Sequence, residues 1–123
     1  MIHQEGEGWR LAWDGARQPF AVLIGGEGWA AELTLAEAEA LRAAVADLVG
    51  QHAALVDQLM AEEAIELELE RGVWWLAVEG DREQWDLRVM LTPDGGQRAI
   101  EGSWPAPASA AFTRALQQLG GQP

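Results

Sequence analysis

Apolar residues occupy every second position in several stretches of the first third of the chain. Residues 9–13 show this two-residue period, which is typical of a half-buried strand, and the runs at 20–24 and 29–33 indicate two more. Glycine-rich turns separate them. The pattern predicts an antiparallel meander of three strands, preceded by a frayed terminus that contains His3.

A helical pattern follows this meander. Thr34 and Glu37 have the spacing of a capping box, in which each side chain bonds the backbone of the other residue. Apolar positions then recur every three or four residues, which predicts a helix over 35–60. His52 falls on this apolar stripe, so we expect a hydrogen-bonded structural histidine rather than a general base.

The stretch from residue 65 to 104 predicts four strands with two contrasting faces. If Arg71 and Gly72 form a two-residue turn, Leu69 pairs with Trp74 on an apolar face. The opposite face is then strongly acidic, and a shift by one residue would exchange the two faces. The residues predicted on the acidic face are Glu66, Glu68, Glu70, Glu79, Asp86 and Glu101.

A short amphipathic helix closes the chain, with Ser109 as its expected N-cap. The fold class is therefore α+β: two antiparallel meanders of three or four strands, each followed by a helix. We expect one domain over 1–123, made of pseudo-repeat halves at about 1–61 and 62–123. The string Gly-Glu-Gly-Trp occurs at 6–9 and again at 26–29, although coincidence explains so short a match as well as duplication does.

The chain has seven tryptophans and no tyrosine. The predicted register directs six of them inward, as core residues. Trp75 points outward, between Glu68 and Arg88, with Glu101 beyond Arg88. These four residues are the candidate interaction surface, either as a base-stacking or partner-binding platform or as a tryptophan covered by arginine or by a second protomer. The six expected in the core are Trp9, Trp13, Trp29, Trp74, Trp85 and Trp104.

Charge and composition narrow the possible functions. The formal net charge is −12, and every base is an arginine. Because phosphate backbones are held by clustered lysine and arginine, this composition argues against nucleic acid as a partner. There are no cysteines, and the sequence shows neither a signal peptide nor a membrane-length apolar run, which predicts a reducing, cytoplasmic setting.

The residues needed for catalysis do not form a recognisable cluster. His3 and His52 are the two histidines, and neither has a second metal ligand or a triad partner at a suitable spacing. The glutamates between residues 62 and 70 could act as paired carboxylates, but alternate residues on a strand usually form a solvated face. We therefore expect no enzyme activity, no catalytic residues, no metal site and no cofactor.

Five strings are distinctive in combination: Gly6–Leu11, Leu23–Ala30, Leu55–Glu63, Gly80–Arg82 and Gly102–Pro107. Together they resemble a small cyanobacterial family catalogued as domain of unknown function 1818, over nearly the whole chain. Its members are similar in fold to the single-stranded-DNA-binding regulator domains of the Whirly and positive-cofactor-four type. The resemblance implies two curved sheets, each followed by a helix, and by analogy nucleic-acid binding, but it carries over no functional residues. The basic surface of those regulators is replaced here by an acidic one.

Three functions remain open from the sequence. The first is a non-catalytic interaction module that self-associates as a homodimer or binds a protein partner. The second is a single-stranded nucleic-acid binder, which needs arginines gathered by the fold. The third is an acid-dependent hydrolase or metal enzyme, which needs carboxylates that converge in a pocket.

Overall fold

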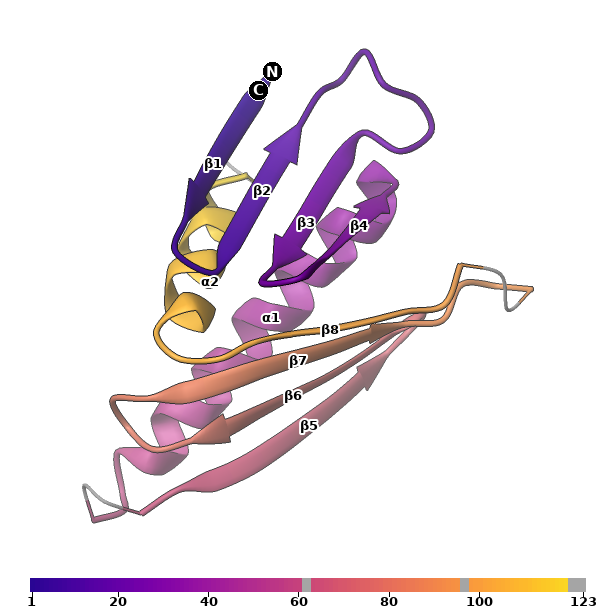
Figure 1. Cartoon of the computed structure of the whole chain (residues 1–123). Coiled ribbons are helices and arrows are strands. Elements are labelled where there is room, and N and C mark those ends of the chain that lie inside the picture. The colour runs from indigo at the N-terminus through magenta and orange to yellow at the C-terminus, as the bar shows by residue number, and fades with distance from the viewer. Residues whose placement is uncertain (61–62, 96–97, 120–123) are drawn as a thin grey trace.

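The computed structural model describes residues 1–60, 63–95 and 98–119, which form two four-stranded sheets and two helices (Figure 1). Sheet A contains β1 (Ile2–Gly6), β2 (Trp9–Trp13), β3 (Val22–Gly26) and β4 (Trp29–Leu33), and is followed by α1 (Leu35–Val56). Sheet B contains β5 (Ile65–Arg71), β6 (Trp74–Gly80), β7 (Trp85–Leu91) and β8 (Ile100–Trp104), and is followed by α2 (Ala108–Leu119). The predicted α+β class is confirmed.

Helix α1 packs mainly on the sheet of the other half, and α2 packs on both sheets. Both sheets are antiparallel with strands in sequence order, and both helices lie behind them in Figure 1. Helix α1 follows sheet A but contacts β5 and β6 far more than β4, whereas α2 follows sheet B and contacts β2 more than any other strand. The two halves therefore share one core and leave the outer face of each sheet uncovered by helix.

The first half has four strands, so the prediction of three strands with a frayed terminus is wrong. Residues 2–6 form β1, and His3 lies on this strand. The repeated Gly-Glu-Gly-Trp string marks two equivalent hairpins, closed by the positive φ of Gly8 (80°) and Gly28 (82°). The indole that follows each turn lies over the glycine that precedes it, where a Cβ atom would collide with the ring.

Helix α1 begins as predicted and ends earlier than predicted. The Glu37 amide donates to Thr34 Oγ1 (3.1 Å), and the Thr34 amide donates to Glu37 Oε1 (2.9 Å), which completes the capping box. The helix stops at Val56 rather than Met60. The Arg82 guanidinium donates to the carbonyls of Val56 and Leu59 (3.3 and 3.2 Å), and so satisfies groups that a longer helix would have bonded internally.

The register of sheet B differs from the predicted one by two residues. The two-residue turn is Gly72–Val73, so Leu69 lies opposite Leu76 rather than opposite Trp74. Gly72 has the positive φ of 59° that suits the first central position of a type II′ turn. Since side chains alternate with a period of two, the shift leaves every side chain on its predicted face.

Two of the six tryptophans expected in the core are fully buried, Trp74 and Trp104. The other four are partly buried and pack against the edge of the core: Trp9, Trp13, Trp29 and Trp85. Trp104 connects the two halves, because it stacks on Phe112 of α2 (centroids 3.9 Å apart), lies 4.9 Å from Trp29 of sheet A, and donates its Nε1–H to the Gly25 carbonyl (2.8 Å).

Smaller differences concern two element boundaries. Ser109 lies inside α2 and is not its N-cap; its hydroxyl donates to the Trp85 carbonyl instead. The strand predicted at 20–24 begins at Val22, and Phe20 lies before it, beneath Arg98 (4.3 Å from the guanidinium carbon to the ring centroid).

His52 is confirmed as a structural histidine: it is buried, and its Nε2 lies 3.0 Å from the Gly80 carbonyl oxygen.

Candidate functional site

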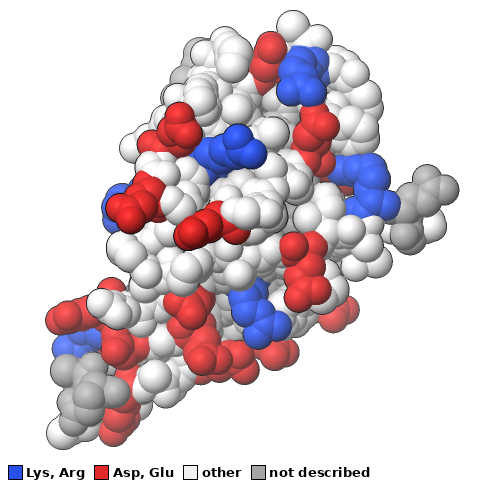
Figure 2. Space-filling model, in the orientation of Figure 1, with Lys and Arg blue, Asp and Glu red and all other residues white. Residues whose placement is uncertain are grey.

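The outer face of sheet B carries the predicted candidate residues. Its side chains come from alternate positions of β5 to β8, and we call this surface the acidic face. Its carboxylates are exposed, and within these four strands Arg88 is the one base that points outward. In Figure 2, red side chains predominate over the strands of sheet B. The acidic face consists of Glu66, Glu68, Glu70, Trp75, Ala77, Glu79, Asp86, Arg88, Met90, Glu101 and Ser103.

Trp75 lies on β6, near the end of the acidic face where a turn joins β5 to β6. Its direct neighbours across the strands are Glu70 and Met90, not Glu68 and Arg88 as the predicted register required. Arg88 is a diagonal neighbour, and its guanidinium carbon still lies 5.2 Å from the centroid of the Trp75 ring, a distance typical of a cation–π pair. This interaction holds the indole against the sheet while leaving it partly exposed.

The other two predicted residues lie close by on the same face. Glu101 is opposite Met90 on the neighbouring strand, and Glu68 is opposite Ala77. Directly opposed side chains on a sheet are about 5 Å apart, and diagonal ones lie within reach of a long side chain. The structure therefore brings all four candidate residues into one patch, although each has different immediate neighbours from those predicted.

A hollow of about 580 Å³ opens beside the Trp75 ring. Sequence analysis missed part of its wall, because the two-residue error in register moved Met90 and Glu70 away from Trp75. The alternation had already placed Glu70 on the outer face, and Met90 could have been placed there in the same way. The hollow is lined by Glu70, Gly72, Val73, Trp74, Trp75, Arg88, Met90 and Thr92.

Like charges are crowded on the acidic face. Glu66 and Glu79 are directly opposite each other on β5 and β6. A hydrogen bond with the Glu79 carboxyl, together with partial desolvation and the nearby negative charges, raises the pKa of Glu66 above its ordinary value. Such crowding disfavours the ionised carboxylates at neutral pH, and a cation placed over the face would relieve it.

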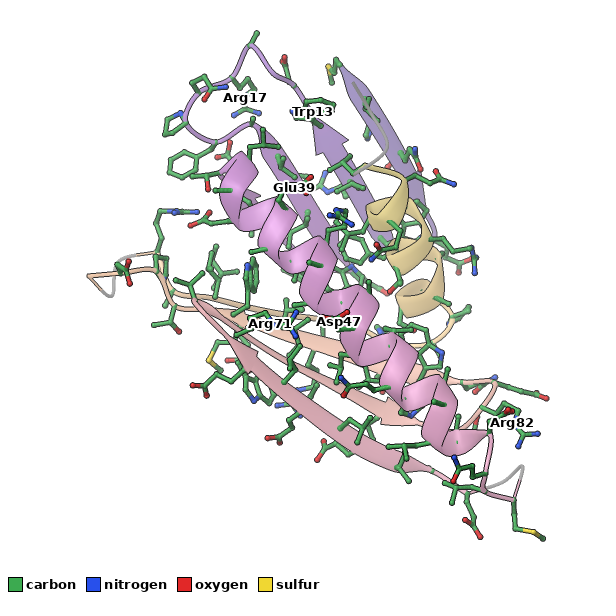
Figure 3. All side chains as sticks on the ribbon, turned by 180° about the vertical axis from the view of Figure 1, so that it is seen from behind. Trp13, Arg17, Glu39, Asp47, Arg71 and Arg82 are labelled. Atoms are coloured by element: carbon green, nitrogen blue, oxygen red, sulfur yellow. The ribbon has the colours of Figure 1, made fainter. Side chains whose placement is uncertain are left out.

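Most of the arginines outside this face are neutralised locally. Figure 3 shows Arg71 of β5 beside Asp47 of α1, and the two side chains form an ion pair of 2.7 Å. In the view of Figure 2 the blue patches are separate from one another. The further pairs are Arg17–Glu32 (2.6 Å), Arg98–Glu37 (3.0 Å), Arg42–Glu39 (3.2 Å) and Arg82–Asp57 (3.9 Å).

The described residues contain no group of three or more histidine, cysteine, aspartate or glutamate side chains placed to hold a metal ion. The side chains of Glu66, Glu68 and Glu70 are exposed on the outer face and do not converge on one another in a pocket; of the three, Glu70 alone lines the open hollow beside Trp75, and Glu62 lies outside the described residues. Neither helix that the structure describes is long and apolar enough to cross a membrane.

Comparison with known proteins assigns the family. Fold and surface define an α+β protein of two antiparallel sheets with one strongly acidic face. Residues 4–119 match the family described as domain of unknown function DUF1818, and the chain belongs to that family.

The chain is also similar to a protein of unknown function from Prochlorococcus sp. NATL2A, described as a member of the DUF155 family. The crystal structure of that protein has 39% sequence identity, a TM-score of 0.91, and coverage of 98% of this chain and 99% of the other. Among curated proteins, the search finds no match.

Proposed function

We propose that this protein is a non-catalytic interaction module that binds a partner protein through the acidic face. The observation that carries the proposal is the hollow beside Trp75, whose indole lies 5.2 Å from the Arg88 guanidinium and whose wall includes the Glu70 carboxylate. An exposed aromatic residue with neighbouring charges is a common anchor at protein interfaces, because the ring buries a large area at little cost in side-chain entropy.

The charge of the face indicates a basic partner. Lysine or arginine side chains would face carboxylates all across the sheet and would relieve the crowding between Glu66 and Glu79. A homodimer through this same face, which was also expected from the sequence, would bring two acidic surfaces together, and like charges in contact cost several kcal/mol. We therefore favour a basic partner protein over a second copy of the chain.

Binding of single-stranded nucleic acid is the second candidate, suggested by the resemblance to the Whirly and positive-cofactor-four domains. It has one supporting feature, Trp75 on an open sheet face, where bases could stack. Against it, the face repels phosphate, and arginines elsewhere are engaged with carboxylates such as Glu32 and Glu37.

A titration with fluorescein-labelled octalysine and with an oligothymidine strand distinguishes these candidates at physiological salt. We expect the octalysine to bind and the oligothymidine not to bind. Trp75→Ala should weaken octalysine binding by about 2- to 5-fold, the value of an exposed cation–π contact, and Trp75→Phe should restore most of it. Arg88→Gln should tighten octalysine binding, because it removes the competing cation from the ring.

Matched charge variants separate the acidic face from the net charge of the chain. Glu68→Gln with Glu101→Gln removes two charges from the face, whereas Glu7→Gln with Glu27→Gln removes two from exposed hairpin turns of sheet A. Equal weakening by both pairs, or tighter binding of oligothymidine than of octalysine, would refute the proposal. Sedimentation velocity on the wild-type chain and Trp75→Ala tests the dimer: association that depends on Trp75 would assign the face to a second copy.

A further inference from the structure

Strand β5 forms a free edge of sheet B. Among the strands of the described residues, β5 lies beside β6 only, and it runs along the lower border of the molecule in both Figure 1 and Figure 3. At seven residues it is among the longest strands in the structure. A free edge of this length presents unpaired backbone groups that another extended chain can bond.

The ladder geometry shows which backbone groups face the edge. Gly72 and Val73 close a two-residue turn, so the flanking pair Arg71 and Trp74 is a hydrogen-bonded pair, and such pairs alternate along an antiparallel ladder. The bond from the Thr92 amide to the Val73 carbonyl (2.9 Å) fixes the same alternation on the β7 side of β6. The N–H and C=O groups that point to the free edge are therefore those of Glu66, Glu68 and Glu70.

The apolar side of β5 is incompletely covered. Ile65, Leu67 and Leu69 point toward α1, yet all three remain partly exposed, whereas Leu76 and Val78, opposite them on β6, are fully buried. An additional strand beside β5 would cover these three side chains with its own apolar residues. The edge thus combines free backbone groups, glutamates on one side and partly exposed aliphatic residues on the other.

We propose that β5 accepts an extended segment of the partner protein by antiparallel strand addition, and that this segment alternates basic and apolar residues. Its basic side chains lie opposite Glu66, Glu68 and Glu70 on the acidic face, and its apolar side chains cover the aliphatic row of β5. This inference rests on the proposed function, because the added strand would lie beside the same acidic face. It adds a second binding site, the free backbone edge of β5, and a sequence pattern for the segment that binds there.

Charge excludes β5 of a second copy as the preferred occupant. A symmetric antiparallel pair centred on Glu68 would place Glu66 opposite Glu70 and Glu68 opposite itself, and like charges directly opposed on a sheet are destabilising. The same glutamates that prevent self-pairing, as charged edges do in many proteins, attract lysine or arginine at alternate positions. The occupant is therefore a different protein with a basic, strand-forming segment.

Isomeric N-methylated peptides test strand addition directly. The probe is acetyl-Val-Lys-Val-Lys-Val-Lys-Val-amide, labelled for fluorescence anisotropy, whose lysines lie opposite the three glutamates when the strands are paired in full. In this register the lysine amides bond β5 and the valine amides face away. N-methylation of the three lysine amides should therefore weaken binding at least about tenfold relative to N-methylation of three valine amides.

Two triple variants of the protein serve as matched controls. Replacement of Glu66, Glu68 and Glu70 by glutamine should weaken binding of the unmodified peptide by between about 1.5- and 5-fold per residue, the value of an opposed charge pair. The same change at Glu5, Glu7 and Glu27, which are exposed on sheet A, should leave binding unchanged.

The two proposals fail in different ways. If both methylated peptides bind equally and Trp75→Ala still weakens octalysine binding, strand addition is refuted and the acidic face stands as the binding surface. If the alternating peptide fails to bind at millimolar concentration while octalysine binds, strand addition is again refuted. If binding of the alternating peptide depends on the lysine amides but Trp75→Ala has no effect on octalysine binding, the partner binds at the edge of β5 and the proposal that it binds in the hollow beside Trp75 is refuted.

Discussion

The two sheets have similar construction and very different outer faces. Both are four-stranded antiparallel meanders in sequence order. The outer face of sheet A has small side chains at its centre, including Ala12, Gly25 and Ala30. On that face Glu5 is directly opposite Arg10, so opposite charges are paired. On sheet B, by contrast, Glu66 is directly opposite Glu79.

This difference distinguishes side-chain arrangements that stabilise the fold from arrangements that do not. Pairing of opposite charges on sheet A is the arrangement expected where stability is the main constraint. On sheet B the crowded carboxylates repel one another, and the partly exposed indole of Trp75 contributes far less to stability than a buried indole such as that of Trp104. Local departures from stable arrangements are common at functional sites, and for this reason we place the binding surface on sheet B.

Removal of the Trp104 indole, which connects the two sheets, should lower the free energy of unfolding more than any other change proposed here. Trp104→Ala deletes a buried ring that stacks on Phe112 and bonds Gly25, so we expect the free energy of unfolding to fall by about 3–5 kcal/mol in urea titrations. Trp75→Ala, its matched control on the outer face of the same sheet, should cost less than about 1 kcal/mol. A comparable loss in both variants would mean that Trp75 is structural, and the contrast between the faces would fail.

The approach of sheet A to β8 can be tested at Gly102. A Cβ atom at this position would collide with the ring of Trp29, which also donates its Nε1–H to the Ser103 carbonyl (3.2 Å). Gly102→Ala should therefore cost about 1–3 kcal/mol in the same urea titrations, because the indole must shift. Gly15→Ala is the control, since no atom lies within 4 Å of its added methyl group. Equal stabilities would show that Trp29 does not pack on β8.

The sequence predicted which face of sheet B each side chain occupies better than it predicted which side chains lie opposite one another on neighbouring strands. Alternation placed every acidic residue of sheet B on the correct side, because a two-residue period is insensitive to a two-residue slip. Arg71, predicted in the turn, is the last residue of β5. It could not place Trp75 between Glu70 and Met90. The Glu70 neighbour depends on whether the turn uses Arg71 or Val73, and the Met90 neighbour depends on the length of the separate loop between Gly80 and Trp85. The positive φ of Gly72 fits either turn, and the packing of α1 beneath the sheet is a tertiary effect.

Strand β1 was missed although a signal for it was present. Its inward positions include Gln4 and Gly6, which lack the apolar character of a strand pattern. The repeat of Gly-Glu-Gly-Trp at 6–9 and 26–29 was the better guide, because the same string forms the same hairpin twice. The packing of α1 on sheet B and of α2 on both sheets has no local signal of this kind.

The capping box of α1 should make a moderate contribution that depends on pH. Burial alone raises the pKa of Glu37, but hydrogen bonds from Arg98 and Thr34 outweigh it, so the pKa lies below its ordinary value. Because the folded state favours the ionised carboxylate, its stabilisation is present above the ordinary pKa of about 4.3 and is lost as the pH falls below it. Glu37→Gln keeps a side chain that can bond the Thr34 amide but removes the charge that pairs with Arg98, so it should cost up to about 1 kcal/mol at pH 7 in urea titrations and less at pH 3. An equal cost at both values would contradict this assignment.

The smallest predicted effect is a change in melting temperature when one glutamate on each outer face is replaced by glutamine. Hydrogen bonding and repulsion from Glu79 raise the pKa of Glu66, so the folded chain loses stability as the pH rises through that pKa. Glu66→Gln should therefore raise the melting temperature slightly at pH 7, and the gain should disappear at low pH. Glu5→Gln, which removes an attraction to Arg10, should lower the melting temperature slightly. Shifts of the same sign would remove the electrostatic contrast between the sheets.

The most direct test of the acidic face as the binding surface is an NMR titration of the isotope-labelled chain with octalysine. The indole Nε1–H of Trp75 and the amides of Glu68 and Arg88 should shift progressively, while the amides of Ala12 and Ala30 on the outer face of sheet A stay in place. Shifts of the sheet A amides without a change at the Trp75 indole would contradict the account.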